Sequence, residues 1–85
     1  MTLYCISYDL IDKKDYEKIE KTLKKYKNFH ALESVWFIET EEEALIIRKK
    51  LKEATDKDDE IFVVEIKKHW ASTNVSGIPD WLKSK

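Results

Sequence analysis

The stretch Leu3-Tyr4-Cys5-Ile6-Ser7-Tyr8-Asp9-Leu10 decides how the rest of this chain can fold. It contains no Gly or Pro, and its only charge is Asp9, near its end. A strand exposed on one face alternates apolar and polar residues, whereas a strand covered on both faces is apolar almost throughout. The stretch therefore predicts a central strand with a lone carboxylate, Asp9, at its carboxyl end.

The composition is typical of one small globular domain. The chain has 85 residues, of which 42% are hydrophobic and 39% are charged, and it contains one Gly and one Pro. Regular elements joined by short turns are expected. Sixteen basic and seventeen acidic residues give a net charge of −1, so the whole molecule has no attraction to nucleic acid or anionic membranes. Any nucleic-acid role needs a local patch or a metal.

The single cysteine and the hydropathy pattern predict a cytoplasmic protein. Cys5 has no second cysteine for an internal disulfide, and it is expected to be a buried, inert thiol. No apolar run is long enough to span a membrane, and the chain enters a strand at once, which predicts no signal peptide. His30 and His69 have no zinc-ligand spacing with Cys5.

Two amphipathic helices are predicted. The first begins with Asp12 as its N-cap and runs for roughly four turns. Thr40 and Glu43 have the spacing of a capping box, which predicts that the second helix begins at Thr40. Apolar residues recur at spacings of three and four in both helices, namely Tyr16, Ile19, Leu23 and Tyr26 in the first and Ala44, Ile47, Leu51 and Ala54 in the second.

Two more extended segments are predicted, at residues 34–38 and 61–66, because both are rich in β-branched and aromatic residues. The five residues before the earlier segment form either its partner strand in a hairpin or part of one bent strand with a bulge. Trp70 either extends the last strand or starts another. Pro79 suits the first position of a helical turn over residues 79–82 that folds back onto the body.

This order of elements predicts a two-layer α+β sandwich of the ferredoxin-like type (βαββαβ), with an antiparallel sheet and two helices on one face. We expect residues 1–69 to form this domain. Residues 70–85 are expected to be a C-terminal extension that packs on the same domain or on a dimer partner. Because the strands are apolar on both faces, the open face needs a cover, and a second copy of the chain supplies one. The sequence thus predicts a homodimer.

The pair Tyr8-Asp9 at the end of the first strand and the run Ser34-Val35-Trp36-Phe37 resemble motifs of the small CRISPR-associated adaptation subunit, Cas2. The chain also resembles small bacterial and phage proteins labelled "SinR family", which are Cas2-like. That second resemblance rests on His30-Ala31-Leu32-Glu33-Ser34, Asp58-Asp59 and Asp80-Trp81-Leu82. The middle hairpin is shorter than in Cas2, and the tail from Trp70 departs from the usual Cas2 C-terminus.

The resemblance implies a homodimer in which Asp9 of both subunits lies near the two-fold axis. It implies that Asp9 is catalytic and holds a divalent metal, such as Mg²⁺, for phosphodiester cleavage. It also implies substrate contacts by Tyr8 and Ser34. From the residues alone, the favoured interpretation of Asp9 is a turn residue that accepts backbone hydrogen bonds, and that of Ser34 is a small polar strand residue.

Two functional hypotheses follow. The first is a Cas2-like dimer linked to nucleic acids in bacterial or phage defence, either a metal-dependent endonuclease or an inactive relative. The alternative is a non-catalytic dimer that binds a protein or small ligand, such as an inhibitor, an anti-defence protein or a toxin–antitoxin component. The near-neutral charge favours the alternative, and the Tyr8-Asp9 pair favours the first.

Overall fold

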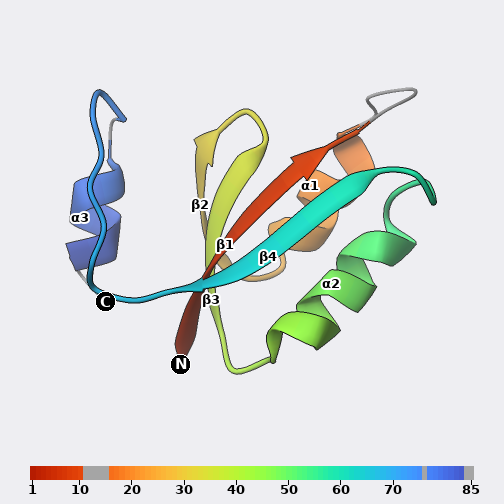
Figure 1. The fold of residues 1–85 in the computed structure, drawn as a ribbon, viewed down its shortest axis with the longest axis horizontal. Helices are drawn as coiled ribbons and strands as arrows, with labels where there is room; N and C mark the ends of the chain where they lie inside the picture. The colour runs from red at the N-terminus through yellow and green to blue at the C-terminus, as the bar shows by residue number, and fades with distance from the viewer. Residues whose placement is uncertain (11–15, 76, 84–85) are drawn as a thin grey trace.

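The computed structural model describes residues 1–10, 16–75 and 77–83. Four strands and three helices follow one another in these residues (Figure 1). Their bounds are β1 (Thr2–Asp9), α1 (Glu17–Leu23), β2 (Lys27–Leu32), β3 (Val35–Thr40), α2 (Ala44–Glu53), β4 (Glu60–Ile66) and α3 (Ile78–Lys83). The predicted α+β class is confirmed.

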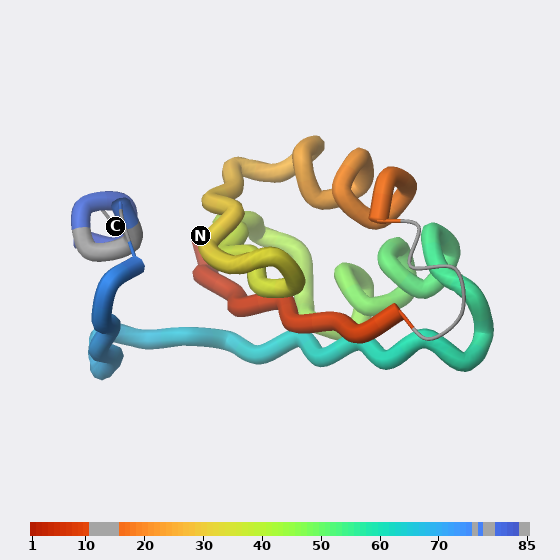
Figure 2. The backbone as a smooth tube through the Cα atoms, turned by 90° about the horizontal axis from the view of Figure 1, so that it is seen from above, coloured from red at the N-terminus to blue at the C-terminus, as the bar shows by residue number. Residues whose placement is uncertain are grey.

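The four strands form one antiparallel sheet in the order β2-β3-β1-β4, so β1 is central, as its apolar sequence predicts. Helices α1 and α2 lie on one side of this sheet, and α3 lies apart from them, beyond β2 (Figures 1 and 2). We call the side without α1 and α2 the open face. The arrangement is the predicted ferredoxin-like sandwich.

The core lies between the sheet and these two helices. In β1 it takes the even-numbered residues, Tyr4, Ile6 and Tyr8, because successive side chains of a strand point to opposite faces. The same alternation places Trp36 and Ile38 in the core and their neighbours on the open face. The helices contribute Ile19, Leu23, Ile47 and Leu51, all fully buried.

The ends of both helices differ from the sequence prediction. Helix α1 ends at Leu23, so Tyr26 lies in a turn, where its hydroxyl donates to Glu42 Oε1 at 2.6 Å. The predicted N-cap, Asp12, lies outside the described residues. The capping box is wrong. Thr40 is still paired in β3, α2 begins at Ala44, and the Thr40 hydroxyl instead accepts the N–H of Glu42 at 3.2 Å.

The structure resolves the two alternatives left open by the sequence. Strands β2 and β3 form a hairpin, and their register shifts between His30 and Leu32. The hairpin and the bulge-like irregularity, which the sequence offered as alternatives, therefore occur together. Strand β4 ends at Ile66, and Trp70 lies in an irregular segment before α3. No helix in the described part of the chain is long and apolar enough to cross a membrane.

Candidate functional site

Asp9 lies at the end of β1, with an exposed side chain on the open face. It borders a hollow of about 520 Å³ between β1 and β4. In the sheet, Asp9 is paired with Glu60, and Ser7 is paired with Phe62. The hollow is lined by Ser7, Tyr8, Asp9, Asp59, Glu60, Ile61 and Phe62.

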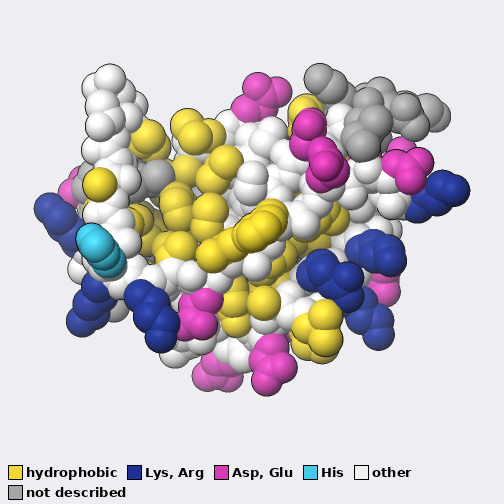
Figure 3. All heavy atoms as spheres, in the orientation of Figure 1, with side chains coloured by type: hydrophobic (Ala, Val, Ile, Leu, Met, Phe, Trp, Pro, Cys, Tyr) yellow, Lys and Arg dark blue, Asp and Glu magenta, His cyan; other side chains and the backbone are white. Residues whose placement is uncertain are grey.

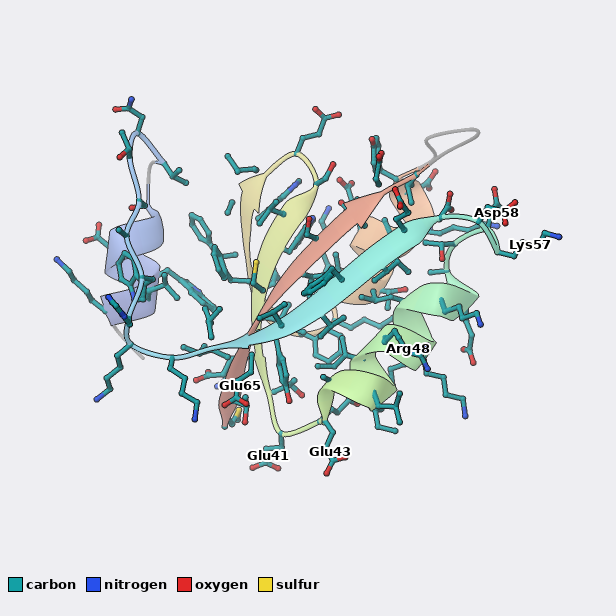
Figure 4. The ribbon with its side chains drawn as sticks, viewed as in Figure 1. Glu41, Glu43, Arg48, Lys57, Asp58 and Glu65 are labelled. Carbon is teal, nitrogen blue, oxygen red and sulfur yellow. The ribbon has the colours of Figure 1, made fainter. Side chains whose placement is uncertain are left out.

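The surroundings of Asp9 are acidic. Asp59 and Glu60 line the same hollow, and Asp58 lies in the turn before β4 with its side chain directed outward (Figure 4). Carboxylate oxygens are the ligands that Mg²⁺ takes in proteins. Within the described residues of one chain, however, no three His, Cys, Asp or Glu side chains are placed to hold a metal ion together. Asp9 therefore does not form a complete cation site with the other described residues of one chain.

Tyr8 points away from Asp9, into the core on the opposite face of β1. The Trp36 indole N–H donates to the Tyr8 hydroxyl oxygen at 3.1 Å, and the Tyr8 hydroxyl donates to the Glu33 carbonyl at 3.4 Å. Burial raises the pKa of the Tyr8 hydroxyl, and the hydrogen bond from Trp36 opposes that rise. Its hydroxyl is thus already engaged within the fold, and the residue fixes the end of β1 against the β2–β3 turn.

Ser34 lies in that turn, next to the end of β1. Its carbonyl oxygen accepts the backbone N–H of Tyr8 at 3.2 Å, and its side chain is half-buried. The ring of His30 stacks on Trp36 with centroids 4.0 Å apart, and His30 Nε2 lies 3.1 Å from the Glu33 carbonyl oxygen. The structure therefore brings Tyr8 and Ser34 together through a main-chain contact.

The sequence reasoning did not find Glu60 and Phe62 as neighbours of Asp9. The signal was present, because an antiparallel last strand beside the first must place its beginning against the end of the first. The sequence pattern places Asp58-Asp59 before the last strand but does not link this pair to Asp9. The register was needed to show which residues of the last strand face the same side as Asp9.

A second polar cluster surrounds Glu42, which lies just before α2. The Glu42 carboxylate accepts hydrogen bonds from the Lys50 ammonium group and the Tyr26 hydroxyl, and its backbone carbonyl accepts the Tyr4 hydroxyl at 2.9 Å. The bonds from Lys50 and Tyr26 lower the pKa of Glu42. Burial, together with the carboxylate of Glu42, raises the pKa of Tyr26. This cluster joins the turn after α1 to α2 and β1 and has a structural role.

The fold resembles the crystal structure of a hypothetical protein, TT1823, from Thermus thermophilus, with a TM-score of 0.72. The two chains are 22% identical, and the match covers 87% of this chain and 92% of the other. No curated protein matches the sequence. The family model described as CRISPR associated protein Cas2 matches residues 1–74, which include β1 to β4 and both helices of the sandwich. The chain therefore belongs to the Cas2 family of CRISPR associated proteins.

Proposed function

We propose that this protein is a homodimeric, cytoplasmic nucleic-acid protein in which Asp9 of two copies holds one divalent cation, such as Mg²⁺, for phosphodiester cleavage. The observation that carries this proposal is the position of Asp9. It is exposed at the end of the central strand, on the same face as an uncovered apolar surface. Two copies that meet over this face bring two Asp9 carboxylates near each other.

That apolar surface, which we call the β1–β4 strip, supplies the reason for self-association. Phe62 and Val64 of β4 are 65% and 39% exposed, and Cys5 of β1 lies between Val64 and Phe37 in the sheet. Figure 3 looks onto this face and shows hydrophobic side chains gathered over the strands. An exposed apolar patch of this kind favours a partner, and an isologous contact between two copies covers it on both.

The donor set fits the proposed cation. Asp9 from each copy supplies carboxylate oxygens, and the cation, when bound, stabilises charge on the phosphate and lowers the pKa of a bound water. In hydrolysis, a water oxygen forms a bond to phosphorus, the bond to the leaving oxygen breaks, and a proton passes to that oxygen. Ser34, in the turn beside β1, is proposed to contact the substrate. Tyr8 is proposed to act there through its main chain, because its hydroxyl is bonded to Trp36 and Glu33.

The test is cleavage of short RNA and duplex DNA by the purified protein in Mg²⁺ or Mn²⁺, with Asp9→Ala beside the wild type. We expect the variant to lose about a hundredfold or more in rate while its oligomeric mass is unchanged. Asp58→Ala is the matched control, since it removes an exposed carboxylate from the neighbouring turn. Absence of cleavage by the wild type, or equal cleavage by Asp9→Ala, would contradict the nuclease proposal.

The alternative function, a non-catalytic dimeric interaction module, is supported by a different observation. Asp59 and Glu60 beside Asp9 make the hollow repulsive to a phosphate unless a cation is bound there. If no metal-dependent cleavage occurs, the same face serves a protein or small-ligand partner. Calorimetric titration of the wild type with Mg²⁺ distinguishes the nuclease from the interaction module, because the interaction module does not need to bind the cation.

A further inference from the structure

We propose that a basic groove beside the hollow at Asp9 binds phosphate groups of the nucleic-acid strand on which Asp9 acts. Arg48 and Lys52 of α2 and Lys57 of the turn before β4 line this groove, which we call the α2–β4 groove. Its ligand is the phosphodiester backbone, which a protein binds by charge without reading the base sequence. The inference rests on the proposed function for the strand at Asp9, but binding in the groove can be measured without cleavage.

The α2–β4 groove is a hollow of about 180 Å³ between the end of α2 and the beginning of β4. Arg48 and Lys52 are four residues apart, so they lie on the same face of α2, and Lys57 comes from the turn that follows this helix. All three residues are exposed. Figure 3 shows Lys and Arg side chains gathered over α2 beside β4, and Figure 4 places Arg48 on this side of the helix. Three cationic residues from two segments therefore line one hollow.

The charge of the groove is positive. It contains two carboxylates, those of Asp56 and Asp59, beside its three cations. One oxygen of Asp59 accepts the backbone N–H of Asp56 at 2.8 Å, so this carboxylate helps to hold the turn. Among the residues that the structure describes, the ion pairs are those of Lys21, Lys50 and Lys67, and none of them uses a cation of the groove. The groove cations therefore keep their charge for a ligand.

The position of these cations is not explained by the helix alone. A cation in the last turn of a helix is stabilised by the helix dipole, and this accounts for Lys52. Arg48 lies in the middle of α2, and Lys57 lies beyond its end, so neither gains much from the dipole. What the three residues share is the hollow that they line.

The groove adjoins the hollow at Asp9. Asp59 and Ile61 line both hollows. Ile61 belongs to β4, an edge strand of the sheet, and it is paired with Tyr8, the residue before Asp9. A strand with one phosphate at Asp9 therefore runs around the edge of β4 and places neighbouring phosphates against Arg48, Lys52 and Lys57.

The proposed function needs such a groove for electrostatic reasons. The chain has a net charge of −1, and Asp59 and Glu60 lie beside Asp9, so neither the whole molecule nor this hollow attracts a polyanion. A local group of cations next to the hollow supplies that attraction. The groove residues are therefore positioning residues, which bind the strand on one side of the phosphate that is cleaved, whereas Asp9 acts at that phosphate.

Arg48→Gln is the direct test, made in the Asp9→Ala background and without divalent cations, so that the strand is not cleaved and repulsion by Asp9 is absent. The measurement is the binding of a short, fluorescently labelled, single-stranded RNA by anisotropy at several salt concentrations. We expect the dissociation constant to rise about fivefold, and the slope of log affinity against log salt to fall by roughly 0.7, because one phosphate contact is lost. Lys57→Gln should have the same effect, and the double variant about twice the effect on the slope.

Lys49→Gln in the same background is the matched control. It removes one positive charge from an exposed residue of α2 next to Arg48, but Lys49 does not line the groove. We expect it to leave the slope unchanged, since salt screens a charge that touches no phosphate. Equal slopes in Arg48→Gln and Lys49→Gln would overturn the proposal, as would the absence of salt-dependent binding by Asp9→Ala itself.

Cleavage separates the groove from the nuclease proposal. In the wild-type background with Mg²⁺, Arg48→Gln should raise KM about fivefold and leave kcat within about twofold, because the groove binds the strand and does not act on the cleaved bond. If no RNA is cleaved but Arg48→Gln and Lys57→Gln lower the salt slope, the nuclease proposal fails and the groove stands. If cleavage depends on Asp9 but both groove variants bind RNA as Lys49→Gln does, the nuclease proposal stands and the groove fails.

Discussion

The two faces of the sheet use alternate residues of the same strands in different ways. On the face under α1 and α2, Tyr4, Ile6 and Tyr8 are at most 6% exposed, and both tyrosine hydroxyls donate to backbone carbonyls. On the open face, by contrast, the Phe62 side chain is 65% exposed to solvent. Stability therefore comes mainly from the covered face, whereas the open face has exposed apolar surface that a partner can cover.

The largest effect that distinguishes the faces is expected from Ile6→Ala. Ile6 is fully buried at the centre of the core, so its truncation leaves a cavity and should cost about 2–5 kcal/mol in the free energy of unfolding. This is a large fraction of the roughly 5–15 kcal/mol that a small domain has. Urea denaturation, followed by circular dichroism, measures the loss.

Val64→Ala is the matched control for that comparison, because Val64 is a β-branched residue of the neighbouring strand on the open face. We expect its cost in the monomer to be below about 1 kcal/mol, since much of the side chain is already in water. Equal losses in the two variants would show that the open face is as well packed as the core.

A smaller effect is expected at the edge of the covered face, from Glu42→Gln. The change keeps the shape of the side chain but removes the charge that accepts hydrogen bonds from Lys50 and Tyr26. Because the cluster is partly exposed, we expect a loss of about 1 kcal/mol at neutral pH. Lys21→Gln, which removes an exposed ion pair with Glu17, is the control and should change stability less.

The effect of Glu42→Gln should depend on pH. The hydrogen bonds from Lys50 and Tyr26 lower the pKa of Glu42 in the folded state below its ordinary value of 4.5. Its contribution is therefore complete above pH 4.5 and is lost as the pH falls through the lower folded-state pKa. The difference between the wild type and the variant should shrink in acid. A constant difference would show that the charge of Glu42 is not what stabilises the cluster.

The sequence pattern was sufficient to predict the fold class, because the fold class follows from the periodicity of apolar residues. The alternation in β1 and the spacing of Ile47 and Leu51 identify the central strand and a buried helix face without any tertiary information. The boundaries failed where a tertiary contact competed with a local one. Thr40 matches a capping box, but it stays in β3, and α2 begins at Ala44, four residues after the predicted start.

The candidate site was less accessible to sequence reasoning, because it is made by residues far apart in the chain. Asp9 was identified from its place at a strand end and from a resemblance. Its neighbours Glu60 and Phe62 follow only from the register between β1 and β4. The contact between the Trp81 ring of α3 and the Phe29 ring likewise depends on the path of the tail, which carries no periodic pattern. Local chemistry is visible in a sequence, whereas the meeting of distant segments depends on the register and path of the chain.

The smallest expected change in monomer stability, and the one most informative about the open face, comes from Phe62→Ser. Phe62 is 65% exposed, so we expect its loss to change the unfolding free energy of the dilute monomer by no more than about 0.5 kcal/mol. The same change should raise the dissociation constant of the homodimer about tenfold or more, because an aromatic side chain at the centre of an interface contributes strongly to binding. Sedimentation at several concentrations measures this constant.

Leu45→Ser is the matched control for Phe62→Ser. Leu45 is 62% exposed, nearly as much as Phe62, but it lies on α2 in the helical layer. Each substitution removes an apolar side chain that is exposed to water to a similar degree. The two differ chiefly in the face of the molecule from which that side chain is removed. A weaker dimer in Phe62→Ser alone assigns self-association to the β1–β4 strip. Equal weakening in both would place the contact elsewhere and would remove the reason for expecting two Asp9 carboxylates to meet.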